Sequence, residues 1–383
     1  MRAVCRALAD ELVATLRDPG ALLILVVGTI GYAFFYPTPY LNQVLRKVPV
    51  AAVDLDRSAL SRQLVRMVDA HPSTAVAFVT GNRSEAERRV MDGEALGILV
   101  IPEGFEKRVH RGEPVTVSAF ADATWFLVYQ AGATGMLEAA ATLGAGIEVA
   151  RLEASGMTRR QALAFRDPAP LLVRPLFNPA EGYASYVVPA VLVLILQQTM
   201  LLGIGLRRPL PLGARTGSGT SLSAAAAAVL GRGLAFFGLQ LLGTLFYLVV
   251  VFRVFGFAER GRAATVLPFL VPFLLATAFL GLWLTTLFRR RESAMQVLLF
   301  TSLPAVFLAG FAWPREALPR WLDLVSLLLP STSAIPGFLR VNEMGASLAQ
   351  VRPEWGTLWA LTLLYFLLAA LAQHRTWRRE QSA

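Results

Sequence analysis

Six long apolar runs, separated by polar segments of unequal length, dominate the pattern of the sequence. Each run approaches the roughly 20 apolar residues that an α-helix needs to cross about 30 Å of hydrocarbon. The runs lie at residues 20–38, 183–206, 224–252, 264–288, 294–312 and 355–373. This pattern predicts a polytopic α-helical membrane protein with six transmembrane helices, in which the last five fall within residues 181–373.

The segment between the first two runs, residues 39–180, has the texture of a folded water-soluble domain. Short apolar stretches alternate there with amphipathic ones, which favours an α/β domain with a partly parallel sheet. The predicted strands lie at 48–56, 74–80, 96–102, 115–122 and, as a candidate closing strand, 171–177. We expect an extracytoplasmic α/β domain inserted after the first span.

The first 19 residues predict an amphipathic helix on the membrane surface. Apolar residues recur every four positions, opposite charged ones, and the helix ends at Asp18-Pro19-Gly20. The apolar stripe consists of Val4, Leu8, Leu12 and Leu16, and the opposite face carries Arg2, Arg6 and Asp10. Because no A-x-A cleavage site follows the first run, we expect that run to be retained as a membrane anchor.

Composition and charge agree with this topology. Of all residues 55% are hydrophobic and only 16% are charged, whereas soluble domains carry roughly 25% charge. The formal net charge is +10, of which residues 39–180 contribute +1 and the rest of the chain +9. Positive charge therefore flanks the apolar runs, as lipid headgroups and the positive-inside rule select, and no basic face for a nucleic acid is indicated.

Arginine clusters set the predicted orientation. They follow the second, fourth and sixth runs and comprise Arg207, Arg208, Arg215, Arg289, Arg290, Arg291, Arg375, Arg378 and Arg379. The positive-inside rule then places both termini, including the tail 374–383, in the cytoplasm and residues 39–180 outside.

Familiar catalytic chemistry is not indicated. The three histidines are far apart and match no metal-ligand spacing, and no GK[ST] sequence of a nucleotide-binding loop occurs. Asp54 and Asp56 follow the first predicted strand and would suit a catalytic pair, but a strand end that caps the next helix explains them better.

The apolar runs hold almost no ionisable groups; Arg232, near one end of the third run, is the exception. Ion-driven transporters usually keep such groups at membrane depth. The polar residues present are Gln197, Gln198, Thr199, Gln240, Thr301 and Ser302. They are candidates for a substrate path, although hydrogen bonds between helices are the favoured explanation. A transporter of this kind would draw its energy from a separate ATPase at the cytoplasmic face.

Four stretches carry a resemblance to a known family. They are LVATLRDPGALL (12–23), VAAVDLDRSALSRQLV (50–65), FNPAEGYASYVVPAVLVLIL (177–196) and FAWPREALPRWLDLVSLLLPSTSAIPGFLRV (311–341). In this order the chain resembles, over essentially its whole length, the membrane permease of ABC-2 type exporters with a large domain after the first span.

The resemblance implies a fold and partners. It implies that the Pro-rich segment 313–345 is a re-entrant pair of short helices, since irregular backbone at membrane depth requires burial in protein or water. It implies an ABC ATP-binding subunit that holds ATP and magnesium, with no cofactor in this chain. A second copy or a paralogous permease would complete the transporter in the bacterial inner membrane, and a periplasmic adaptor could join it.

We interpret the chain as a non-catalytic permease subunit of an ATP-driven exporter of hydrophobic or amphiphilic substrates, an efflux system. The residues expected to contact the ATPase are Arg207, Arg208, Arg215, Arg289, Arg290 and Arg291, for which headgroup binding is an equal explanation. The alternative is a membrane-anchored receptor or assembly protein that acts through its α/β domain.

Overall fold

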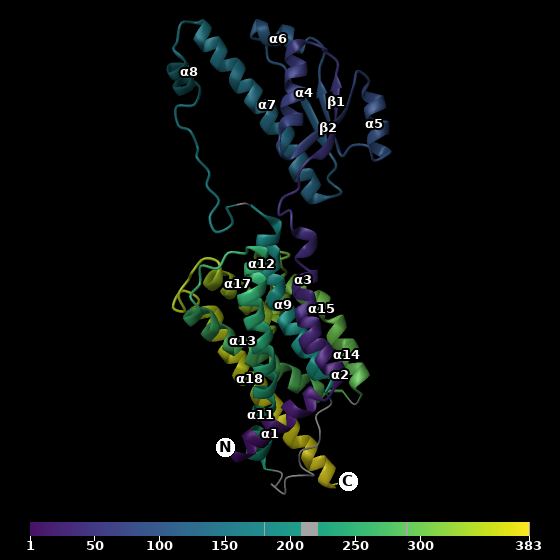
Figure 1. Cartoon of the computed structure of the whole chain (residues 1–383), viewed down its shortest axis with the longest axis vertical. Helices are drawn as coiled ribbons and strands as arrows, with labels where there is room; N and C mark the ends of the chain where they lie inside the picture. The colour runs from purple at the N-terminus through teal and green to yellow at the C-terminus, as the bar shows by residue number, and fades with distance from the viewer. Residues whose placement is uncertain (180, 208–220, 289, 383) are drawn as a thin grey trace. The chain divides into compact units, whose positions relative to one another are not determined.

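The computed structural model describes residues 1–179, 181–207, 221–288 and 290–382 and forms two compact units (Figure 1). The helical unit consists of Met1–Gln43 and Pro175–Ala383, and the α/β unit of Val44–Arg174. The α/β unit lies inside the segment 39–180 and is a few residues shorter at each end.

The α/β unit contains a four-stranded sheet in the order β2-β1-β3-β4. Its strands are β1 (Val48–Asp54), β2 (Thr74–Thr80), β3 (Gly97–Ile101) and β4 (Ser118–Ala121). β1 pairs in parallel with β2 and β3, while β3 pairs antiparallel with β4. The prediction of a partly parallel sheet is therefore confirmed.

The fifth predicted strand, 171–177, was wrong. These residues form no regular element, and Leu171 and Leu172 are exposed. Prolines at 168 and 170 precede the stretch, and a third, at 175, lies within it. Since proline has no N–H to donate to a neighbouring strand, the stretch is poorly suited to extend the sheet.

Helices cover both faces of the sheet. The helices of the unit are α4 (Ala59–Ala70), α5 (Arg83–Met91), α6 (Phe105–Arg111), α7 (Phe126–Ala154) and α8 (Arg159–Arg166), of which α8 packs on α7. Val50 of β1 packs with Leu64 of α4 and Met136 of α7, whereas the next residue, Ala51, packs with Ala86 of α5. This alternation follows from the twofold period of a strand and puts α4 and α7 on one face and α5 on the other (Figure 1).

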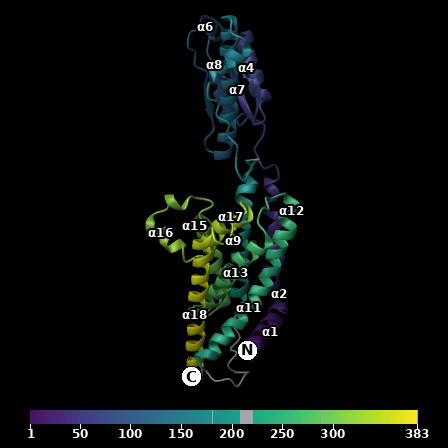
Figure 2. The same cartoon turned by 90° about the vertical axis from the view of Figure 1, so that its left-hand side faces the viewer.

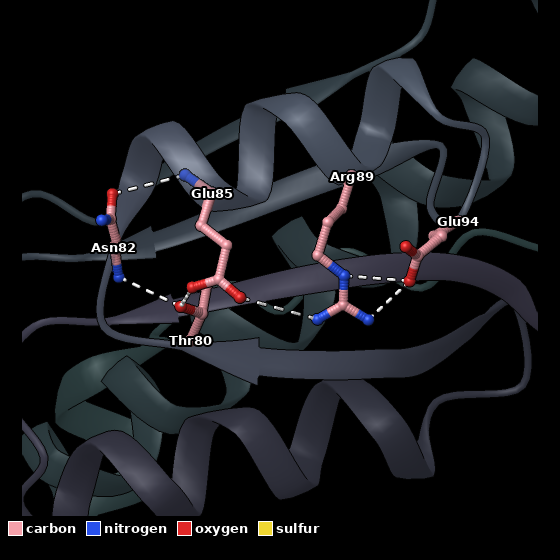
Figure 3. A network of polar contacts seen from close by, with 5 residues as sticks. All are labelled: Thr80, Asn82, Glu85, Arg89 and Glu94. Carbon is pink, nitrogen blue, oxygen red and sulfur yellow. Dashed lines mark hydrogen bonds and ion pairs between the residues drawn. The ribbon is translucent and has the colours of Figure 1, made fainter.

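Polar contacts fix α5 at the end of β2. Figure 3 shows Asn82, whose side chain caps the helix by accepting the N–H of Glu85 at 3.3 Å. Thr80 donates to Glu85 at 2.6 Å, and Arg89 donates to Glu94 at 2.9 Å. The last contact holds the pKa of the Glu94 carboxyl below its usual value.

Among the described residues of the helical unit, five helical segments are long and apolar enough to cross a membrane. They are Pro19–Tyr40, Tyr183–Leu206, Leu222–Phe255, Ala263–Thr285 and Arg352–Arg379. The first is built from α2 (Pro19–Leu22), the π-helical stretch η1 (Leu23–Gly28), α3 (Thr29–Phe35) and the short turn η2 (Thr38–Tyr40). The others are α9 (Tyr183–Leu206), α11 (Leu222–Phe246) with η3 (Tyr247–Val251) and α12 (Phe252–Phe255), α13 (Ala263–Thr285) and α18 (Arg352–Ser382).

The predicted continuous span at 294–312 is instead two short helices, α14 (Arg291–Phe300) and α15 (Ser302–Leu308). Pro304 explains the interruption, because it has no N–H to donate to the carbonyl four residues earlier. Gly310, in the left-handed conformation at φ 83°, lies just past the end of α15.

The Pro-rich segment forms the short turn η4 (Arg315–Ala317) and the helices α16 (Arg320–Ser326) and α17 (Pro330–Asn342). α16 and α17 meet at an angle of 81°, a geometry found in broken spans and in re-entrant loops (Figure 2). Prolines stand immediately before α16 and at the first position of α17, where the lost donor would have no partner in the helix.

Candidate functional site

A buried ionic cluster joins four helical segments of the helical unit, and we define it as Glu11, Asp18, Arg207, Arg232 and Gln373. Glu11 Oε1 lies 3.3 Å from Arg207 Nε, and Glu11 Oε2 lies 3.6 Å from Arg232 Nε. Arg232 Nη1 donates to Gln373 Oε1 at 3.2 Å. The cluster thus connects α1 (Arg2–Leu16) to the end of α9, the start of α11 and α18.

The cluster lies toward the end of the helical unit that carries both chain termini (Figure 1). At this end Ala225 and Ala228 of α11 pack on Trp377 of α18. Glu11 and Arg232 are 6% and 1% exposed. Since a buried charge is costly unless it is paired, their mutual positions fix α1 on the spans.

α1 packs through its small residues rather than through the predicted apolar stripe. Its buried residues are Ala7, Glu11 and Thr15, spaced four apart, whereas Leu16 of the predicted stripe is 49% exposed. The close approach depends on Gly231 of α11, where an added Cβ would lie 2.5 Å from the Val4 carbonyl oxygen. The sequence predicted the helix correctly but not the face that it buries against protein.

Asp18 connects the cluster to the first span. Its Oδ1 accepts the N–H groups of Gly20 and Ala21 and so caps α2, and its Oδ2 lies 3.6 Å from Arg207 Nη1. Arg207, which we expected at the ATPase surface, therefore directs its guanidinium toward two carboxylates of its own chain. Its side chain is 12% exposed.

The other predicted contact arginines are less defined by the structure. Arg208, Arg215 and Arg289 lie outside the described residues, and only the backbone of Arg291, at the start of α14, is described. Arg290 precedes α14 and is exposed. The structure therefore places only Arg207 of this set in a site.

A second polar group joins the first, second and third spans. Thr29 Oγ1 donates to Thr199 Oγ1 at 3.1 Å, and Gln240 Nε2 donates to the same Thr199 oxygen at 3.1 Å. Tyr247 donates its hydroxyl to the Thr29 carbonyl at 2.8 Å. Gln240 thus has the helix-joining role proposed as the alternative to a path; Thr29 and Tyr247 were not singled out from the sequence.

Gln197 makes a two-way contact with α17. Its Nε2 donates to Ser331 Oγ at 3.1 Å, and its Oε1 accepts the Ser331 N–H at 2.8 Å. Thr301 and Ser302 donate to the carbonyls of Leu298 and Leu299, three residues earlier in α14, at 3.0 and 2.6 Å. The predicted path residues are therefore distributed over different faces of the unit rather than gathered in one place.

Two side-chain amide oxygens in the spans lack a hydrogen-bond donor among the described residues. The Oε1 atoms of Gln198 and Gln240 are buried and accept no hydrogen bond from any residue that the structure describes. A cavity in the helical unit is lined by residues that include Leu196, Thr244 and Tyr247, but not by either glutamine, and its volume of about 10 Å³ is room for a single water molecule. An organic substrate does not fit in this cavity.

The carboxylates after β1 have structural roles. Asp54 accepts the Arg57 N–H at 2.8 Å and the Ser61 hydroxyl at 2.9 Å, and Asp56 accepts the Glu106 N–H of α6 at 3.0 Å. Burial would raise the pKa of Asp56, but hydrogen bonds from Ser58 and from the start of α6 lower it overall. Ser58, not either aspartate, caps α4.

Comparison with known proteins decides the family. The ABC-2 family transporter protein model matches residues 20–371. The chain belongs to this family. It is 23% identical over 350 residues, 86% of this chain and 85% of the relative, to the probable multidrug ABC transporter permease YbhS of Escherichia coli K12. It is 27% identical over 103 residues, 27% of this chain and 28% of the relative, to the inner membrane transport permease YhhJ of the same strain.

The resemblance inferred from the sequence is therefore confirmed. The family match and the apolar helices make this chain a multi-pass membrane subunit of an ABC transporter. In its relatives the described role is that of a permease.

Proposed function

We propose that this chain is the non-catalytic permease subunit of an ATP-driven exporter in a bacterial inner membrane. A separate ABC subunit would bind ATP and magnesium and drive the movement of a hydrophobic or amphiphilic substrate outward. The absence of ionisable residues from the apolar runs, Arg232 excepted, supports an external energy source over an ion gradient.

The ionic cluster carries the proposal. It ties α1, the Arg207 end of α9, α11 and α18 together at one end of the helical unit. A partner that pushes on α1 or on the loop 207–222 would move three spans at once, because buried ion pairs resist separation. We therefore propose that this end faces the cytoplasm and receives the motion of the ATPase.

The substrate path is proposed at an interface rather than inside one chain. The cavity lined by Leu196, Thr244 and Tyr247 is too small for a substrate, and we propose that a second copy or a paralogous permease forms the other wall. We propose further that 313–345 is re-entrant from the outer side and that an adaptor meets the α/β unit.

The test is affinity purification of the tagged chain from its native host in mild detergent, followed by mass spectrometry. We expect a co-purifying subunit that carries a Walker A loop. The double substitution Arg208→Gln and Arg215→Gln should remove this subunit, and it leaves Arg207 in the ionic cluster. The matched control is Arg253→Gln with Arg262→Gln, which removes the same charge from the other end of the third and fourth spans.

The outcomes separate two claims. If the wild-type chain purifies without an ATPase while other membrane complexes stay intact, the exporter proposal is refuted and the α/β unit becomes the active part. If the ATPase is present and both double variants retain it equally, the exporter stands and the proposed contact loop is wrong.

A further inference from the structure

A groove lies at the surface of the α/β unit where the parallel strands β1 and β2 end. Its volume is about 420 Å³, and it is lined by Asp54, Arg57, Arg62, Val65, Arg66 and Val79. The lining comes from the end of β1, the loop after it, α4 and the end of β2. None of these residues belongs to the ionic cluster or to the proposed path.

The position of the groove is one at which sheets of this topology bind ligands. β1 is the strand where the order reverses, because β2 lies on one side of it and β3 on the other, and the connecting helices α4 and α5 cover opposite faces. Ligands of doubly wound sheets bind outside the carboxyl ends of the strands near such a reversal. The carboxyl end of β1 forms one wall of this groove.

Contacts within the unit hold two of the three arginines in place. Arg57 has a left-handed backbone at φ 50°, and its guanidinium lies over Gly81, where an added Cβ would be 2.5 Å from Nη2. Arg62 donates from Nη1 to the Arg57 carbonyl at 2.7 Å. Each guanidinium has five N–H donors, so these contacts leave most of them available.

The charge of the groove is positive. Asp54 is 6% exposed, and three groups of its own loop and helix already donate to its carboxylate. In the α/β unit, all of which the structure describes, Arg57, Arg62 and Arg66 form no ion pair with a carboxylate. Val79, 55% exposed, and the half-buried Val65 supply an apolar wall beside them.

We propose that this groove binds a small organic anion. Its carboxylate, sulfonate or phosphate group is held by the guanidiniums of Arg57, Arg62 and Arg66, and its apolar part rests on Val65 and Val79. Guanidinium groups suit this task because they donate paired hydrogen bonds to planar or tetrahedral oxyanions. The proposal does not depend on the exporter function, since a receptor would use the same groove.

The experiment uses the full-length chain in nanodiscs of phosphatidylcholine, titrated with phenyl phosphate by isothermal titration calorimetry at low salt. Phenyl phosphate supplies a dianion and one apolar ring, and benzyl alcohol serves as the neutral analogue. We expect saturable binding of one phenyl phosphate per chain, at least about tenfold tighter than benzyl alcohol and weaker in 150 mM salt.

Arg57→Gln and Arg66→Gln should each weaken binding by about tenfold. Val79→Glu should abolish it by adding a negative charge to the apolar wall. The matched control is Arg159→Gln, which removes the same charge from a side chain of the same unit that is 78% exposed and outside the groove. Circular dichroism and gel filtration of every variant report whether the fold is retained.

Three results would overturn the proposal. The first is the absence of saturable binding above that of empty nanodiscs, and the second is equal affinity for phenyl phosphate and benzyl alcohol. The third is a loss of phenyl phosphate affinity in Arg159→Gln as large as the loss in Arg66→Gln. If Arg57→Gln fails to fold, Arg66→Gln and Val79→Glu decide the matter, because both side chains are exposed and both lie outside the loop after β1.

Discussion

Removing the carboxylate of Glu11 is the sharpest test of how the ionic cluster holds the helical unit. Glu11→Ala removes the carboxylate that lies 3.6 Å from Nε of Arg232, whose side chain is 2% exposed. Arg207 keeps Asp18 at 3.6 Å. The substitution therefore removes an ion pair of the most deeply buried arginine in the cluster.

The magnitude follows from the distances. Two charges at 3.6 Å attract each other by about 4–5 kcal/mol at an effective dielectric constant of about 20. Desolvation of the pair offsets much of this gain in the intact protein, but it is not recovered when only one partner is removed. We expect Glu11→Ala to destabilise the chain by about 3–5 kcal/mol.

The assay is thermal unfolding in one detergent, followed by intrinsic fluorescence. At roughly 2–4 °C per kcal/mol, the melting temperature should fall by about 6–20 °C. The matched control is Asp10→Asn, which removes one negative charge from the exposed neighbour on the same helix and should change stability by less than about 0.5 kcal/mol.

A double-mutant cycle separates the ion pair from packing. Glu11→Leu combined with Arg232→Met removes both charges, and the double variant should be more stable than the sum of the single losses predicts, by about 1–3 kcal/mol. The reasoning would be refuted if the two single losses were simply additive, or if Glu11→Ala behaved like Asp10→Asn.

Two further predictions concern packing and a helix contact. Gly231→Ala should lower the melting temperature, because its Cβ would meet the backbone of α1 at 2.5 Å, whereas Gly238→Ala on the same helix, with nothing within 4 Å, should raise stability by about 0.5–1 kcal/mol; equal signs would contradict the packing. Gln197→Leu leaves the Ser331 N–H and hydroxyl without their partner and should cost about 1–3 kcal/mol in the same assay, while Thr301→Val, whose hydroxyl bonds within its own helix, should cost less.

Local patterns determined much of the architecture. Apolar runs of sufficient length identified five spans, because the transfer of a helix into hydrocarbon depends on its own side chains. Alternating short apolar stretches identified the parallel strands of the α/β unit, since a strand shows its period within a few residues. The start of the first span at Asp18-Pro19-Gly20 was likewise readable, because the cap is made by neighbours in sequence.

Other features needed the tertiary structure. The run 294–312 is apolar throughout, and only the folded chain showed that its helix is interrupted at Thr301, before Pro304. The stretch 171–177 has the composition of a strand, but whether it reaches the sheet depends on the residues around it and on the free edge of the sheet.

The ionic cluster could not be predicted from the sequence. From the sequence, Glu11 was one charge on a predicted surface helix, and Arg207 was a predicted contact for a partner. Arg232 was an isolated charge in an apolar run. The sequence determined that each charge exists and on which helix it stands. Only the packing of α1 against Gly231 decided that these charges meet, because an ion pair between distant segments depends on the approach of backbones that no local pattern encodes.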